Sequence, residues 1–288
     1  MEIIRNPEKL NIEGSSVAIG KFDGIHKGHQ VLIKDICKDA VPVVLSFENG
    51  RLLPENEENR IFDAMGVKYL IRCKLTEDIR MLEPEEFVKK ILVDRLHISK
   101  LVCGPDFRFG KDRKGDTDTL RFLSKKYGFT LKVFDNCMCE NEKISSSNIR
   151  PLLLKGEVSK VRELLGHPYM ISGEVVFGRK IGRTLDFPTI NIIPDEKIIL
   201  PPCGVYYTKV EICGIIYDGV TNVGHNPTVT DEGKISVETH ILGEKGDFYG
   251  EFVKVYFYEF VRPEKKFKSL EDLRRQIRED VNGYRVNT

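Results

Sequence analysis

The segment Ala18–His29, with the sequence AIGKFDGIHKGH, decides the fold of the first half of the chain. Its apolar start predicts a buried strand over Ser16–Phe22, and a glycine-containing turn then leads into a helix predicted over His29–Asp39. A strand, a tight turn and a helix in succession are typical of a parallel sheet covered by helices. The segment therefore predicts an α/β domain.

The same alternation of short apolar strands and amphipathic helices continues to about residue 165. It leaves Glu48–Asn59, which is polar and rich in turn formers, as a predicted loop. The further predicted strands are Val41–Phe47, Leu101–Gly104 and Thr130–Asp135, and the further predicted helices are Pro84–Leu96 and Thr117–Tyr127.

The pattern changes after Gly166, where six segments of strand character are separated by glycine-containing turns. Strands at this spacing predict a small antiparallel β-barrel. A helix over Ser269–Val281, with Ser269 as its N-cap, follows them. We therefore predict two domains, residues 1–166 and residues 167–288. The six predicted strands are Tyr169–Phe177, Thr189–Ile193, Gly204–Ile212, Ile216–Val223, Ile235–Leu242 and Glu251–Val261.

Composition narrows the class of protein. The 45 Lys and Arg residues nearly cancel the 44 Asp and Glu residues, and this balance argues against a nucleic-acid partner. No apolar run approaches 18 residues and the first residues do not resemble a secretory leader, so we expect a cytoplasmic protein with no membrane partner. Seven scattered cysteines in such a chain predict neither a disulfide framework nor a zinc site, and the oligomeric state stays open.

The turn in the opening segment is a candidate site for phosphate groups. Backbone N–H groups at the start of a helix attract anions, and Gly28 lets a phosphate approach the backbone closely. His26 and His29 are three residues apart, so they can point the same way and stabilise charge on a polyphosphate that is attacked at its α-phosphorus. The alternative is a tight turn with two incidental surface histidines.

Two further segments of the first domain carry candidate ligand-binding side chains. Consecutive serines, including Ser146 and Ser147, precede a predicted helix with Arg150, which can bind phosphate oxygens in a forked geometry; the alternative is an ordinary N-cap. The segment Gly104–Asp116 follows a strand end, where ligands bind in open α/β sheets. Its aromatic residues between Arg and Gly favour contact with a flat ligand, the alternative being a solvated loop.

The barrel domain carries its own candidate site at Gly178–Asn191. This segment is not a Walker A loop, because no Gly-Lys-Ser/Thr ends it. Thr189 and Asn191, two apart on a strand, face the same side and could hold Mg²⁺ with ATP phosphates, unless the segment is only a turn and a strand. Glu238 could accept the proton of an attacking hydroxyl, or be a surface glutamate.

These motifs resemble those of the bifunctional bacterial riboflavin kinase/FMN adenylyltransferase family, also called FAD synthetases. The resemblance implies a Rossmann-like nucleotidylyltransferase domain with a parallel sheet, followed by a riboflavin kinase-like, six-stranded antiparallel barrel with a terminal helix. The motifs are Phe22–His29, Gly104–Asp116 and Ile144–Arg150 in the first domain, and Gly178–Asn191, Thr221–Gly224, Asn226–Thr228, Glu238 and Arg262–Glu264 in the second.

The resemblance implies a role for each candidate residue. Glu238, His26, His29 and Arg150 would be catalytic, with Glu238 the base on the ribityl 5′-hydroxyl of riboflavin, and Thr189 and Asn191 would lie at Mg²⁺. The implied flavin-binding residues are Asp106, Phe107, Arg108, Asn222 and Arg262. The implied ATP- and phosphate-binding residues are Gly20, Phe22, Asp23, Gly24, Gly28, Ser146, Ser147, Gly178, Gly182, Arg183 and Pro188.

The implied function is phosphorylation of riboflavin to FMN by ATP in the C-terminal domain and adenylylation of FMN to FAD, with release of pyrophosphate, in the N-terminal domain. The alternatives are a riboflavin kinase with weak or lost adenylyltransferase activity, and an adenylyltransferase for another acceptor. Two departures from the family affect the first domain. The segment after Phe47 is short and lacks a Pro-His-Pro sequence, and Pro151 follows Arg150, which predicts that the helix there starts later.

Overall fold

The computed structural model describes residues 1–5, 10–47, 52–140, 142–177, 187–225, 235–244 and 246–284. The chain forms two compact units. The first contains residues 1–50 and 55–145, and the second contains residues 51–54 and 146–288. None of the helices in the described ranges is long and apolar enough to cross a membrane.

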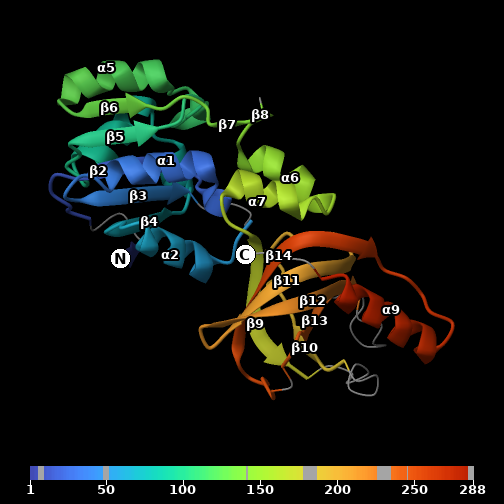
Figure 1. The fold of residues 1–288 in the computed structure, drawn as a ribbon. Helices are drawn as coiled ribbons and strands as arrows, with labels where there is room; N and C mark the ends of the chain where they lie inside the picture. Colours follow the sequence, from blue (N-terminus) through green and yellow to red (C-terminus); the bar gives the residue numbers. More distant parts are fainter. Residues whose placement is uncertain are drawn as a thin grey trace. The chain divides into compact units, whose positions relative to one another are not determined.

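The first unit is built on a six-stranded sheet in which all strands are parallel, as the sequence predicts (Figure 1). Strand β2 (Ser16–Gly20) lies in the interior of the sheet. The strands that follow it in the chain are added first on one side of β2 and then on its other side. The order across the sheet is β1 (Glu2–Ile4), β4 (Tyr69–Cys73), β3 (Pro42–Phe47), β2, β5 (Lys100–Cys103) and β6 (Thr130–Val133).

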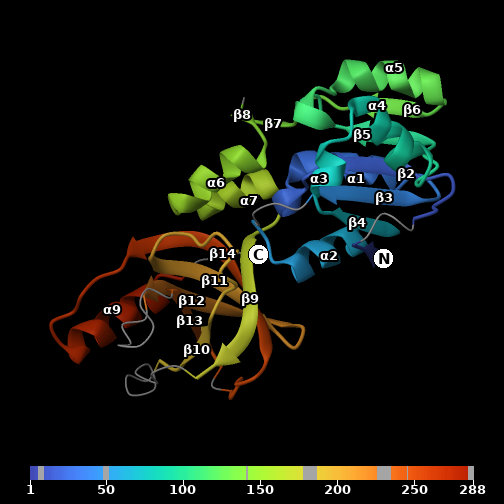
Figure 2. The ribbon, with the colours of Figure 1, turned by 180° about the vertical axis from the view of Figure 1, so that it is seen from behind.

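Helices cover both faces of this sheet. Successive residues of a strand point to opposite faces, so each strand contributes side chains to two apolar cores. In β2, Val17 and Ile19 join one apolar core while Ala18 joins the other. The Ala18 core contains residues of α1 (Lys27–Ile36) and α2 (Glu55–Ala64). The other core contains residues of α4 (Pro84–Phe87), of the π-helical turn Val88–Val93 that continues it, and of α5 (Thr117–Tyr127); Figure 2 shows α4 from behind.

Two predictions for this unit are wrong. The segment predicted as a loop through Asn59 becomes helical at Glu55, because its acidic residues lie in the first turn of α2, where the helix dipole favours negative charge. The helix predicted over Pro84–Leu96 is divided into α4 and a wider π turn. The remaining short elements are α3 (Glu77–Arg80), β7 (Met138–Cys139) and β8 (Glu142–Lys143).

The second unit contains a closed, six-stranded antiparallel barrel, and all six predicted strands are confirmed. Inside it, Thr208, Thr221 and Thr239 are fully buried, with hydroxyl–hydroxyl distances of 2.7 and 2.8 Å that satisfy these polar groups. The order around the barrel is β10 (Thr189–Ile192), β13 (Ile235–Ile241), β12 (Ile215–His225), β11 (Gly204–Ile212), β14 (Phe252–Pro263) and β9 (Tyr169–Val176).

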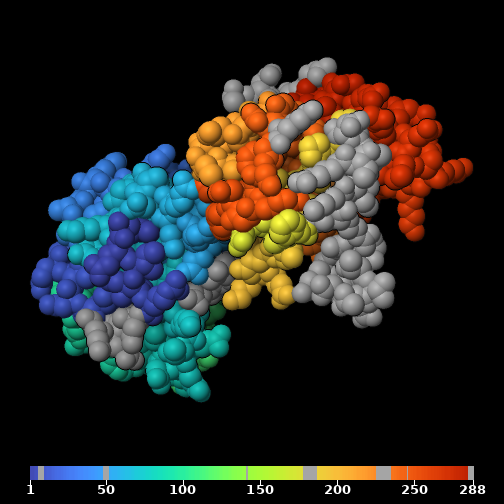
Figure 3. Space-filling model, turned by 90° about the horizontal axis from the view of Figure 1, so that it is seen from below, coloured from blue at the N-terminus to red at the C-terminus, as the bar shows by residue number. Residues whose placement is uncertain are grey.

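The terminal helix α9 (Leu270–Asn282) begins as predicted at the N-cap Ser269, whose hydroxyl accepts a hydrogen bond from the Asp272 N–H at 3.1 Å. Figure 3 shows this helix in red on the surface of the barrel unit. Val281 and Tyr284 pack on an apolar cluster of strand residues that lies outside the barrel. That cluster consists of Val205, Tyr207 and Val220.

Helices α6 (Ser146–Leu154) and α7 (Val158–Leu165) pack with the barrel rather than with the parallel sheet. The Ser159 hydroxyl donates to the Tyr258 carbonyl at 2.9 Å, and the Arg162 guanidinium lies 5.1 Å from the centre of the Tyr258 ring. The packing thus divides the chain between residues 145 and 146, whereas the sequence predicts a functional boundary after residue 166, which remains a proposal.

The prediction that Pro151 delays the start of the helix is wrong, since α6 begins at Ser146 and contains the proline. Pro151 has no N–H to donate to the carbonyl four residues earlier, that of Ser147. The helix tolerates this loss close to its first turn.

Candidate active sites

The glycine-containing turn of the first unit connects β2 to α1 through a strained backbone. Phe22 and Ile25 adopt positive φ angles of 50° and 40°, which bulky residues avoid, and Gly24 has a φ of 77°. The reversal at Phe22 ends the strand at Gly20, two residues earlier than predicted. Both strained side chains are buried, so packing holds the turn in this conformation, and strain of this kind is concentrated at functional sites.

The two histidines of this turn stack on each other. Their ring centroids are 3.6 Å apart with an interplanar angle of 18°. His26 is the N-cap of α1, and its Nδ1 accepts a hydrogen bond from the His29 N–H at 3.3 Å. The buried Nδ1 of His29 has no hydrogen-bond partner among the described residues.

Burial keeps both histidines neutral at neutral pH. It lowers the pKa of His26 from 6.5 to about 4 and lowers the pKa of His29 well below 6.5, with the neighbouring His26 as a second cause. Neutral imidazoles donate or accept hydrogen bonds without adding a full positive charge. An anion at the turn between β2 and α1 would therefore be held by N–H groups and the α1 dipole, not by imidazolium charge.

Close packing at the turn between β2 and α1 favours glycine at Gly28. A Cβ at this position would lie 3.2 Å from the His26 ring and 3.4 Å from Cβ of Cys137. At Gly20, a Cβ would lie 3.4 Å from the Phe22 ring. Asp23 and Gly24 are buried within the turn, so the predicted residues of this motif form one compact feature.

A cavity of about 610 Å³ lies at the carboxyl ends of the parallel strands, where the rule for open α/β sheets places a ligand. It is lined by residues that follow β2 and β5, including the predicted residues Gly20, Asp106, Phe107 and Arg108. Asp106 is paired with Lys143. Phe107 stacks on Phe109 at a centroid distance of 5.6 Å, which gives the cavity a flat aromatic wall.

The predicted triphosphate residues Ser146, Ser147 and Arg150 lie on α6 and so belong to the second compact unit, whereas His26 and His29 belong to the first. Ser146 and Ser147 are the first two residues of that helix.

The strand register brings the predicted kinase residues together on the outer face of the barrel. Asn191 lies opposite Glu238, and Glu238 lies opposite Asn222 on its other side. Thr189 lies opposite His240 in the adjacent row. Residues directly opposite in an antiparallel pair share a face, so these five polar side chains form one surface.

A cavity of about 350 Å³ covers this surface, with the apolar side chains of Leu273 and Ile277 from α9 in its wall. Arg262 also lines it. Its guanidinium donates two hydrogen bonds to the buried carboxylate of Asp280 in α9, with Nε–Oδ1 and Nη2–Oδ2 distances of 2.9 and 2.7 Å. The Gln276 amide donates to the same carboxylate at 3.1 Å. The predicted flavin-binding Arg262 thus holds the helix that forms one wall of the cavity.

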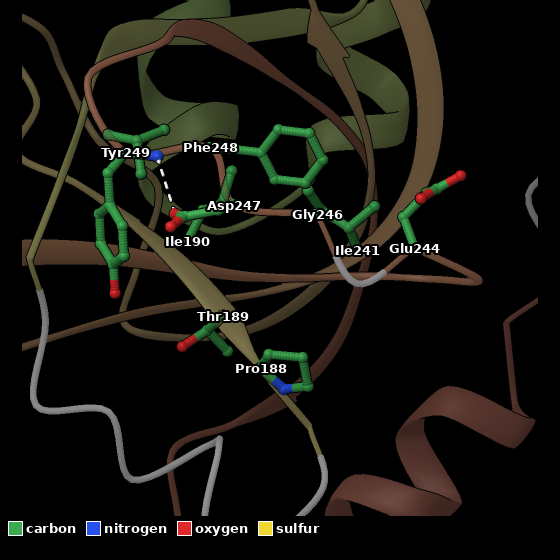
Figure 4. Close-up of a pocket in the computed structure, with 10 residues that line it drawn as sticks. Pro188, Thr189, Ile190, Ile241, Glu244, Gly246, Asp247, Phe248 and Tyr249 are labelled. Carbon is green, nitrogen blue, oxygen red and sulfur yellow. Dashed lines mark hydrogen bonds between the residues drawn. The ribbon is translucent and has the colours of Figure 1, made fainter.

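A hydrogen bond holds the residue before β10 against β13, since a ring nitrogen of His240 lies 2.9 Å from the Pro188 carbonyl oxygen. Thr189 also borders a second hollow, shown in Figure 4, where the Tyr249 N–H donates to Asp247 at 3.4 Å. Its volume is about 30 Å³, much smaller than the cavity beside Glu238. The predicted ATP-binding residues Gly178, Gly182 and Arg183 lie outside the described residues.

The sequence interpretation missed several lining residues of both cavities. His240 could have been found from its spacing, because it is two residues from Glu238 and shares its face. Asp280 could not, because its partner Arg262 is 18 residues away. Phe47, Arg80 and other residues of the first cavity come from segments whose meeting depends on the sheet order.

Comparison with known families matches each unit to a different model. Residues 8–148 match the model for FAD synthetase, and residues 165–287 match the model for riboflavin kinase. The chain is 34% identical to proteins named bifunctional riboflavin kinase/FMN adenylyltransferase from Pseudomonas fluorescens and from Escherichia coli K12. These alignments cover 99% and 97% of this chain, and 97% and 96% of the respective relatives.

A solved structure supports the same architecture over the whole chain. A crystal structure described as a macrolide-efflux protein from Streptococcus pneumoniae is 30% identical and superposes with a TM-score of 0.87. The match covers 97% of each chain. The combination of parallel-sheet unit and closed barrel is therefore shared with an experimental structure.

Proposed function

The chain belongs to the bifunctional riboflavin kinase/FMN adenylyltransferase family, and from this membership we propose which residues carry each reaction. The protein is a bifunctional transferase. Its C-terminal riboflavin kinase domain makes FMN from riboflavin and ATP, and its N-terminal FAD synthetase domain makes FAD from FMN and ATP. The observation that carries this conclusion is the match of both units to the two family models. Its use of ATP supports a cytoplasmic location.

The direct test is incubation with riboflavin and Mg-ATP, followed by chromatography of FMN and FAD. Formation of both flavins is expected. FMN without FAD would mean that the first unit has lost its activity, and neither flavin would contradict the conclusion.

For the kinase, we propose that Glu238 accepts the proton of the ribityl 5′-hydroxyl. The hydroxyl oxygen then bonds to the γ-phosphorus of ATP while the bond to the β,γ-bridging oxygen breaks and ADP leaves. Support comes from the position of Glu238 in the cavity wall, beside Asn222 and opposite Asn191. Arg262 acts through Asp280 as a positioning residue that keeps α9 against the flavin.

The proposed Mg²⁺ would be held by Thr189 and Asn191. Their neutral oxygens, close to the Glu238 carboxylate in the strand register, are the hard ligands that this cation prefers. When bound, the ion neutralises charge on the ATP phosphates.

For the adenylyltransferase, we propose that an FMN phosphate oxygen attacks the α-phosphorus of ATP and that pyrophosphate leaves. His26, His29 and the N-terminus of α1 would stabilise the charge that develops on the phosphate oxygens. Support comes from the buried Nδ1 of His29, which has no hydrogen-bond partner among the described residues, and from the position of His26 as the N-cap of α1. Ser146, Ser147 and Arg150 are proposed to bind the triphosphate.

A fragment comparison tests the domain boundary. The fragment 146–288 is expected to phosphorylate riboflavin and to unfold at a higher temperature than the fragment 167–288. The shorter fragment lacks α7, whose buried Val158, Val161 and Leu165 cover apolar surface in the second unit. Losing several such side chains costs more than about 2 kcal/mol. Thermal unfolding followed by circular dichroism measures this, and equal midpoints would contradict it.

The lowered pKa of His26 predicts how stability depends on pH. The unfolded chain binds a proton at His26 near pH 6.5, but the folded protein binds it only near pH 4. The unfolded state therefore binds more protons between these values, and the free energy of unfolding falls as the pH falls through this range, by at most about 3 kcal/mol from this residue. Above pH 6.5 this contribution to stability is complete.

Urea unfolding of the wild type and His26→Gln at about pH 7.5 and about pH 5 measures this effect. Glutamine keeps an acceptor for the His29 N–H but does not titrate. The variant should lose less stability on acidification than the wild type. Equal losses would show that His26 does not carry the effect.

A further inference from the structure

The 610 Å³ cavity of the first unit has an excess of unpaired positive charge. Three of its lining charges are neutralised by carboxylate–cation pairs, namely Asp106 with Lys143, Arg108 with Asp116, and Asp112 with Lys114. The other three lining charges are cations with no carboxylate within 4.0 Å among the described residues. These three are Lys21, Arg80 and Arg113.

The same cavity offers an apolar, aromatic surface. Phe47 and Phe87 line it together with the stacked pair Phe107 and Phe109. A flat aromatic ligand fits such walls, and unpaired cations in a concave site concentrate an anion. The fitting ligand therefore combines a flat ring system with a negatively charged group.

We propose that Lys21, Arg80 and Arg113 form the subsite for the 5′-phosphate of FMN and make this unit select FMN over riboflavin. This inference rests on the proposed adenylyltransferase function. Riboflavin carries the same ring system but no phosphate, so contacts to the ring alone cannot separate the two flavins. Charge-assisted hydrogen bonds to the phosphate supply the difference.

The position of Lys21 connects this subsite to the reaction. Lys21 lies between Gly20, which lines the cavity, and Phe22, which starts the strained turn that leads to the N-terminus of α1. A phosphate bound by Lys21 would therefore lie beside the turn that carries the proposed ATP site. The FMN phosphate oxygen that forms the new bond to the α-phosphorus must lie at this border, while the pyrophosphate leaves toward the N-terminus of α1.

Arg80 provides the sharpest test, because it is exposed on α3 and has no carboxylate within 4.0 Å in the part of the chain that the structure describes. Arg80→Ala should raise KM for FMN in FAD formation by about 10- to 100-fold, the usual effect of losing one charge-assisted hydrogen bond. KM for ATP should stay unchanged. Arg80→Lys should recover part of the loss. Arg121→Ala, which removes an exposed arginine of α5, is the matched control and should behave as wild type.

Inhibition by riboflavin separates ring contacts from phosphate contacts. The constant for inhibition of FAD formation by riboflavin is measured in a Glu238→Gln background, so that the kinase does not convert the inhibitor into FMN. It should be the same with and without Arg80→Ala, because riboflavin has no phosphate to lose. A higher inhibition constant for riboflavin would assign Arg80 to the ring, and a higher KM for ATP would assign it to the triphosphate. Either result overturns the proposal, as does an unchanged KM for FMN.

These outcomes are distinct from a failure of the proposed function. If wild-type protein forms FAD and Arg80→Ala binds FMN normally, only the subsite is wrong. If wild-type protein forms no FAD from FMN and Mg-ATP, the proposed function of the first unit is wrong. FMN formation from riboflavin by each variant confirms that the chain was made and that its barrel unit is folded.

Discussion

Glu238→Gln should lower the rate of FMN formation by about 10²- to 10⁴-fold, the usual contribution of a positioned general base. Glutamine keeps the shape and the hydrogen-bonding capacity of the side chain but cannot accept the proton of the ribityl hydroxyl. Because Glu238 lines the cavity and lies opposite Asn191 and Asn222, the substitution should leave the strand pairing intact. Steady-state phosphorylation of riboflavin measures kcat and KM separately, and the loss should fall on kcat.

Glu259→Gln on β14 is the matched control, since it removes an exposed carboxylate of the same barrel. It should keep wild-type turnover. Thr189→Ala should also slow the reaction, and added Mg²⁺ should partly restore it if the hydroxyl is a ligand. Near-normal turnover of both Glu238→Gln and Thr189→Ala would show that the kinase site lies elsewhere.

The strands of the barrel could be predicted because each is a segment of strand character bounded by turns that contain glycine. Strand β4 was missed for a reason that the local sequence cannot reveal. Arg72 is the fourth of the five residues of that strand and is only 4% exposed, which is unfavourable for an isolated charge. Its partners are Glu58 and Asn59 of α2, at 3.1 and 2.7 Å, and they lie 14 and 13 residues away in the chain. Only the folded sheet shows that the charge of this arginine is paired.

In the candidate sites, too, features set by neighbouring residues in the sequence could be predicted, whereas features set by strand pairing could not. The shared face of Thr189 and Asn191 follows from their spacing on one strand, whereas their proximity to Glu238 follows from the register of β10 against β13. The two histidines could be placed at a helix N-terminus from the glycines around them. The cations of the first cavity could not, because Lys21, Arg80 and Arg113 come from three separate connections after strands.

His29→Ala should lower the rate of FAD formation by about 10²- to 10³-fold while FMN formation persists. The size is that of removing one preorganised donor to a developing negative charge. His29 stacks on His26 and has a buried, unpartnered Nδ1, so it is positioned for a ligand rather than for the fold. Its surroundings favour the neutral imidazole, and a hydrogen-bonding neutral replacement such as His29→Asn should therefore recover part of the rate.

The selectivity of this loss is expected because the two reactions are assigned to different sets of residues. His29 belongs to the parallel-sheet unit, whereas Glu238 and the flavin cavity of the kinase belong to the barrel unit. The field of a helix N-terminus acts over about one turn, so the effect of His29 on charge is local to the start of α1. A time course with riboflavin and excess Mg-ATP should therefore show FMN accumulating in His29→Ala. His97→Ala is the control because it removes a half-exposed histidine of the same unit that bonds to Asn11. If His29→Ala lost both activities while it remained folded, the two sites would be coupled, and the assignment of His29 to adenylylation alone would be wrong.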